Sequence, residues 1–190
     1  MLKGVILDMD GTVTVPYIDW KALREKIGAV PERTILEHID SLPSERSAWA
    51  NEELRKTERE AAERAAPNEG LNELVDYLRS KGIGIALVTN NHKEAMQTVI
   101  RRFGLEFDVA LSRDDGELKP SGDLIEKALQ ALGVQPEEAI KIGDSRYDVE
   151  ACRRTGVRCI YLTNGKPTLD HAPSAEGLGE VLQLLQTDGS

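Results

Sequence analysis

The chain has 190 residues, 40% of them hydrophobic, which is enough for one substantial core with at most a small appended domain. Its formal net charge of -9 repels polyphosphate backbones, so we expect no nucleic-acid partner. No apolar run reaches the roughly 18 residues that a membrane span needs, and residues 1–4 lead into a strand-like run without a signal-peptide pattern. We therefore expect a cytoplasmic protein with no membrane partner.

Short apolar runs rich in β-branched and aliphatic residues predict buried parallel strands. Helical patterns separate them, because apolar residues recur on one face near 71–78, 96–103, 124–132 and 178–185. Strands that alternate with helices of this length predict an α/β fold with a Rossmann-like, doubly wound parallel sheet. The expected strands are 4–7, 83–88, 109–111, 139–142 and 158–162.

One region after the first strand breaks this alternation, because it contains only helical patterns punctuated by prolines. We predict a small all-helical domain at 16–67, inserted into an α/β core formed by 1–15 and 68–190. The charge pattern of 51–64 favours a solvated helix without a role in chemistry. The expected helices of the insert are 19–27, 31–39 and 44–65.

The first strand runs directly into two acids, Asp8 and Asp10, which are followed by Gly11. The two-residue period of a strand directs both acidic side chains to the same side. Gly11 permits a tight turn that leaves backbone N–H groups free to face an anion. Ligands of open α/β sheets bind beyond the carboxyl ends of the strands, so both acids are expected in that crevice.

A second acidic pair, Asp144 and Asp148, follows the fourth strand. Asp148 lies one turn further along an expected helix, so both carboxylates can face one cavity. Together with Asp8 and Asp10 they would repel one another unless a cation intervenes, and a hard divalent ion such as Mg²⁺ fits oxygen ligands. Taken alone, each pair is also explained by chance or by helix capping.

Two further segments supply groups that suit a phosphate. Thr89 and Asn90 follow the second strand, where the Thr89 hydroxyl and the Asn90 N–H could donate to phosphoryl oxygens. Thr89 could equally cap the following helix. Lys119 precedes a proline, which predicts a loop ahead of a helix, and there it could place positive charge beside the phosphate.

These segments, in this order, resemble the four motifs of the haloacid dehalogenase superfamily, in its phosphoglycolate phosphatase-like branch with a small helical cap. Residues 8–12 resemble the first motif, Thr89 the second, Lys119 the third and 143–148 the fourth. The resemblance covers residues 4 to 163 and implies a Rossmann-like sheet with the first strand in its centre. It also implies a phosphatase, since the dehalogenase branch carries no acid at the position of Asp10.

The resemblance implies a role for each matched residue. Asp8 would attack phosphorus and form an aspartyl-phosphate, while Asp10 would protonate the leaving oxygen and then deprotonate water. Mg²⁺ would be held by the Asp8 carboxylate, the Asp10 carbonyl and Asp144, and Asp148 would act through water or by fixing Lys119. The phosphoryl oxygens would be cradled by Thr89, Lys119 and the N–H groups of Gly11 and Asn90.

The expected substrate is a small phosphorylated metabolite of the phosphoglycolate or sugar phosphate type. A phosphomutase resembling β-phosphoglucomutase and a non-catalytic binding module on the same fold stay open as alternatives, as does the choice between monomer and dimer. His92, just past the phosphate-binding turn, could also reach the substrate. Candidates for substrate contact in the insert are Trp20, Arg24, Arg33, His38, Arg46 and Trp49.

Overall fold

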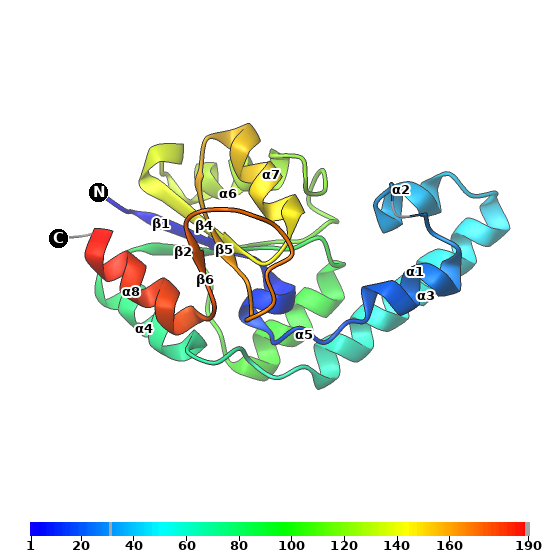
Figure 1. Ribbon diagram of the computed structural model, residues 1–190, viewed down its shortest axis with the longest axis horizontal. Coiled ribbons are helices and arrows are strands. Elements are labelled where there is room, and N and C mark those ends of the chain that lie inside the picture. The colour runs from blue at the N-terminus through cyan, green and yellow to red at the C-terminus, as the bar shows by residue number, and fades with distance from the viewer. Residues whose placement is uncertain (31, 189–190) are drawn as a thin grey trace.

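A six-stranded parallel sheet organises the computed structural model, which describes residues 1–30 and 32–188 (Figure 1). The strand order is β3-β2-β1-β4-β5-β6, and each pair of neighbours runs parallel. β1 lies inside the sheet and is buried along its whole length, which explains its uninterrupted apolar sequence. The strands are β1 (Gly4–Leu7), β2 (Gly84–Val88), β3 (Val109–Leu111), β4 (Ala139–Gly143), β5 (Arg158–Leu162) and β6 (Ser174–Ala175).

Helices cover both faces of this sheet (Figure 1). On one face, apolar residues of α4 (Leu71–Ser80), α5 (Lys93–Phe103) and α8 (Leu178–Asp188) pack against the strands in one buried cluster. On the other face, α6 (Asp123–Leu132) and α7 (Arg146–Thr155) form a second cluster. The predicted doubly wound α/β fold and its central first strand are confirmed.

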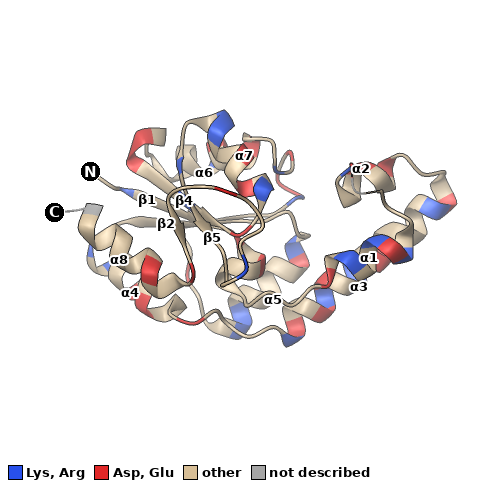
Figure 2. Cartoon of the chain, in the orientation of Figure 1, with Lys and Arg blue, Asp and Glu red and all other residues tan. Residues whose placement is uncertain are grey.

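The segment after β1 contains helices that enclose a small cluster of their own, with Leu23, Ile39 and Leu54 buried, while α3 (Ser44–Arg64) also packs on α5 of the core. α1 (Trp20–Ile27) and α3 lie side by side, and α2 (Ile35–Asp40) packs near the far end (Figure 1). We call residues 16–67 the helical insert. Charged residues of both signs are interspersed along α1 and α3, as expected for helices with solvated faces (Figure 2).

Local sequence signals set the helix starts in the insert. Asp19 accepts the N–H of Ala22 at 2.9 Å, and Thr34 forms a capping box with Glu37 at the start of α2. α2 therefore begins later than the expected helix 31–39, whose first residue, Pro31, lies outside the described residues.

Within residues 1–30 and 32–188, no helix combines the length and the apolar character required to cross a bilayer.

Candidate active site

The carboxyl ends of β1, β2 and β4 meet below a cleft of about 390 Å³, with the helical insert on its other side. The sequence-predicted residues that line this cleft include both acids of the first motif, the cradle residues and one acid of the fourth motif. Asp148 is fully buried behind them. Those at the cleft surface are Asp8, Asp10, Gly11, Thr89, Asn90, Lys119 and Asp144.

The turn after β1 places the first two acids. Asp8 and Asp10 keep extended backbone angles, while Gly11 adopts φ +74° in the left-handed region. A Cβ atom at Gly11 would lie 1.9 Å from Asp144 Oδ2, so only glycine fits where the turn meets the β4 end. Asn164, from the segment after β5, donates its side-chain N–H to the Gly11 carbonyl at 2.8 Å and fastens the turn.

Lys119 joins the two acidic pairs. Its Nζ lies 2.5 Å from Asp8 Oδ1 and 2.7 Å from Asp148 Oδ1, and its side chain is only 4% exposed. The loop that carries it is held by Asn90, whose side chain accepts the Lys119 N–H at 2.9 Å and donates to the Lys119 carbonyl at 3.1 Å. The side chain of Asn90 thus positions the lysine, a role that the sequence did not reveal.

Asp148 has two structural partners besides Lys119. Its Oδ2 accepts the Ser145 hydroxyl at 2.5 Å in the capping box of α7, and its Oδ1 forms an ion pair with Lys141 Nζ at 2.9 Å. Burial alone would raise the pKa of Asp148, but the charges of Lys119 and Lys141 outweigh burial and hold that pKa well below its usual range. Asp148 therefore favours its charged form and anchors both lysines.

The other three carboxylates differ from Asp148 because burial dominates their environment. Burial and the nearby charge of Asp148 raise the pKa of Asp8, although Lys119 opposes the shift. Burial and the charge of Asp8 raise the pKa of Asp10 to about 7 and that of Asp144 to about 8. Carboxyls crowded in this way fit a site that shares a cation.

Three of these carboxylates could hold a divalent metal ion. Asp8, Asp144 and Asp148 each offer an oxygen, and these oxygens lie within 4.8 Å of one another. The side chain of Asp10 is not in this group, so the predicted role of Asp10 as a metal ligand rests on its main-chain carbonyl alone.

Thr89 is buried at the end of β2, where its hydroxyl accepts the N–H of Asn91 at 3.1 Å. It does not cap the next helix, because the N-cap position of α5 belongs to His92. Because the Thr89 hydroxyl oxygen accepts this bond, the hydroxyl can still donate its hydrogen to a ligand in the cleft.

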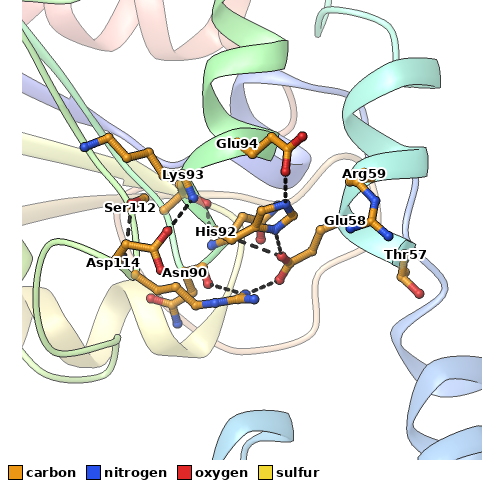
Figure 3. Close-up of polar contacts among 12 residues, drawn as sticks. Thr57, Glu58, Arg59, Asn90, His92, Lys93, Glu94, Ser112 and Asp114 are labelled. Carbon is orange, nitrogen blue, oxygen red and sulfur yellow. Dashed lines mark hydrogen bonds and ion pairs between the residues drawn. The ribbon is translucent and has the colours of Figure 1, made fainter. Parts of the chain in front are cut away.

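A buried ionic cluster, missed by the sequence analysis, joins the insert to the sheet domain. Glu58 of α3 is 1% exposed and its carboxylate bonds to the His92 ring and to the Arg113 guanidinium. The main-chain N–H of His92 also donates to Glu58 Oε2 at 3.3 Å. Figure 3 shows Glu58 pointing from α3 toward His92 at the start of α5.

This cluster corrects the expectation that 51–64 is only a solvated helix, because Glu58 also lines the cleft. The helical period provided a signal that could have revealed it. Leu54, Glu58 and Ala61 share one face of α3, and all three are buried. His92 is buried beside Glu58 and is not among the side chains that line the cleft.

The sequence analysis also missed two residues that support the site, Lys141 and Asn164, although each has a feature that could have revealed it. Lys141 interrupts the apolar strand β4, where a charge needs a buried partner. Asn164 has φ +50°, which is compatible with asparagine in a turn.

Of the substrate candidates in the insert, Trp20 and Arg24 line the cleft. Within the described chain, Arg33, His38, Arg46 and Trp49 do not line it.

Comparison with known proteins shows which family has this arrangement. The model of the family described as haloacid dehalogenase-like hydrolase matches residues 14–162, which include Thr89, Lys119 and both acids of the fourth motif. The chain belongs to this hydrolase family. An uncharacterized hydrolase of Saccharomyces cerevisiae is 31% identical over 97% of this chain and 91% of its own length, so the relationship also extends across the β1 acids.

Two further relatives agree with this assignment. The phosphorylated carbohydrates phosphatase of Thermotoga maritima is 29% identical over 89% of this chain and 91% of its own. The crystal structure of a HAD-superfamily hydrolase, subfamily IA, from Geobacter sulfurreducens superposes with a TM-score of 0.68 at 25% identity. That superposition covers 97% of this chain and 100% of the Geobacter chain.

Proposed function

We propose that this hydrolase is a magnesium-dependent phosphomonoesterase in which Asp8 is transiently phosphorylated. The observation that carries the proposal is the position of Asp8 at the base of the cleft. Its Oδ1 contacts Lys119 Nζ at 2.5 Å, and its carboxylate lies beside those of Asp144 and Asp148. An oxygen nucleophile between a fixed ammonium group and a candidate metal site suits attack on a phosphate ester.

The chain's own groups suit the remaining steps. Asp10 lines the same cleft two residues beyond the nucleophile, where it would protonate the leaving alcohol and then take a proton from water. Lys119 would neutralise charge on the transferring group, and Thr89 with the N–H groups of Gly11 and Asn90 would bind its oxygens. Asp148 would hold Lys119 in place, because its oxygens already accept two lysines and Ser145.

The donor set fits a hard divalent cation. Asp8 and Asp144 would hold Mg²⁺ through carboxylate oxygens, and Asp10 would add its main-chain carbonyl. When bound, the ion would offset the charge of the acids and polarise the phosphate. The helical insert would act as a cap that closes the cleft and excludes water.

The substrate we propose is a small phosphorylated metabolite. The volume of about 390 Å³ is near the lower end of small-molecule sites, so it favours a compact ester. The name of the Thermotoga maritima relative, a phosphatase of phosphorylated carbohydrates, supports hydrolysis of phosphate esters in this family.

Release of inorganic phosphate from p-nitrophenyl phosphate with Mg²⁺ tests this proposal. Asp8→Asn should lower kcat by at least about a thousandfold, because the covalent route is lost. Asp76→Asn, an exposed change on α4, serves as the matched control and should leave kcat unaltered. A chelator should abolish turnover and added Mg²⁺ should restore it. Equal rates for the wild type and Asp8→Asn, or phosphate transferred to another position of a sugar without release, would contradict the proposal.

A further inference from the structure

One part of the cleft lining differs from the acids in chemistry. Apolar and aromatic side chains cover it, and most of them belong to the helical insert. We call this set the apolar wall, and it consists of Tyr17, Ile18, Trp20, Ile35, Leu36 and Tyr147.

Aromatic side chains are concentrated in the apolar wall. The whole chain has two Trp, four Tyr and two Phe, and three of these residues line this one cleft. Tyr17 is 46% exposed and Trp20 is 38% exposed, although both are large hydrophobic groups. Exposed aromatic surface that faces a reaction site marks a surface for ligand contact.

The polar groups of the insert that line the cleft are partly engaged within the protein. The Arg24 guanidinium donates through one nitrogen to the carbonyls of Val30 at 3.1 Å and Arg33 at 2.9 Å. The Thr34 hydroxyl accepts the N–H of Glu37 at 3.1 Å, and Glu58 is bound by His92 and Arg113.

A substrate rich in hydroxyl groups would therefore give up hydrogen bonds to water and regain few from this wall, beside which Arg24 keeps donors other than the nitrogen that bonds to Val30 and Arg33. An apolar ring would lose nothing of that kind and would gain contact with exposed aromatic surface. The balance favours an aromatic substituent over the sugar groups expected from the sequence.

We propose that the preferred substrates are phosphate esters whose alcohol carries an aromatic ring, held against Trp20 and the rest of the apolar wall while the phosphate lies on the acids. This inference rests on the proposed phosphatase activity and specifies its substrate class. Ring contact is expected from Trp20 and Tyr17 of the insert and from Tyr147 at the start of α7, so insert and core both contribute. The residues that recognise the ring are then different from those that act on the phosphate.

The test compares kcat/KM for phenethyl phosphate, butyl phosphate, glycerol phosphate and phosphoglycolate with Mg²⁺. Phenethyl and butyl esters have leaving alcohols of similar acidity, so a difference between them reports binding of the ring. The wild type should prefer phenethyl phosphate to each of the other esters by about tenfold, the usual size of one good aromatic contact.

Variants of two tryptophans locate the effect. Trp20→Leu should remove most of the phenethyl preference, whereas Trp20→Phe should keep it, because leucine retains apolar volume without a ring. Trp49→Leu is the matched control: Trp49 is 41% exposed on α3 of the same insert but does not line the cleft, and its variant should keep the preference.

Each outcome decides between the two proposals. Turnover of p-nitrophenyl phosphate with equal constants for phenethyl and glycerol phosphate would overturn the substrate class alone. So would a preference for phosphoglycolate, or equal effects of Trp20→Leu and Trp49→Leu. Absence of turnover with every ester would overturn the proposed phosphatase function and this inference with it.

Discussion

The two sides of the cleft are built on different principles. On the sheet side, ionic groups are buried and bonded to one another, as in the chain from Asp8 through Lys119 and Asp148 to Lys141. On the insert side, aromatic groups such as Trp20 remain partly exposed. Reacting groups need fixed charges in a low-dielectric site, whereas recognition needs surface that a ligand can cover. We therefore propose that the sheet side carries the chemistry, while the insert, together with Tyr147 of α7, carries the selectivity.

After the loss of Asp8 itself, the largest effect should come from removing the ammonium group of Lys119 on the sheet side. Lys119→Met leaves Asp8 without the ammonium group 2.5 Å away, so kcat/KM should fall about a hundredfold to a thousandfold. Lys166→Met, at an exposed position, is the control. Steady-state kinetics on p-nitrophenyl phosphate measures both, with circular dichroism as the check on folding. A Lys119→Met enzyme with unchanged activity would contradict the role of the buried ionic groups in catalysis.

A substitution of Lys141 tests whether the buried ion pairs of the sheet side also stabilise the fold together. Lys141→Met removes a fully buried partner of Asp148, and the free energy of unfolding should fall by about 3 kcal/mol. The loss should be smaller in an Asp148→Asn background, since the two residues are coupled. Urea unfolding of the four variants of this cycle gives the coupling. Equal losses in both backgrounds would mean that Lys141 does not act through Asp148.

The junction between the two sides should show an intermediate effect. Glu58→Gln removes the negative charge shared by His92 and Arg113, and the free energy of unfolding should fall by about 2 kcal/mol. Glu63→Gln, an exposed change on the same helix, should alter it by less than about 0.5 kcal/mol. Denaturant unfolding of both variants checks this. Indistinguishable variants would show that the buried cluster does not fasten the insert.

The smallest effect concerns Asp108, far from both sides. The N–H of Ile85 and the Arg79 guanidinium hold the pKa of Asp108 below its ordinary value of 3.8. A lowered pKa stabilises the fold above 3.8, and this contribution is lost as the pH falls through the native pKa. Because the pair is partly exposed, Asp108→Asn should cost only about 0.5 kcal/mol at neutral pH and nothing in strong acid. A cost that does not vary with pH in urea titrations would contradict this.

The ionic side was largely predictable from the sequence, because parallel strands bring their carboxyl ends to one edge. Asp8, Thr89 and Asp144 each follow a recognisable strand, so their convergence required only the fold. The helices of the insert were also predictable in number and place, although the N-cap Thr34 starts α2 later than the expected residue 31. β6 was missed because it has only two residues, Ser174 and Ala175.

The contacts of the insert with the core could not be predicted. The bond between Glu58 and His92 depends on how α3 packs across α5, which no local pattern specifies. The exposure of Trp20 and its place in the cleft depend on the same packing, whereas Trp49, in an equally plausible sequence context, faces elsewhere. Sequence patterns fix which face of a helix is apolar, but tertiary packing decides what that face meets.

The most direct test of the account is to trap the phosphorylated enzyme. A labelled phosphate ester is mixed with the Mg²⁺-loaded protein, quenched in acid within the first turnover, and the peptides are mapped by mass spectrometry. We expect one phosphoryl group on the peptide that contains Asp8, and none in Asp8→Asn. A phosphoryl group on another residue, or full activity in Asp8→Asn, would contradict it.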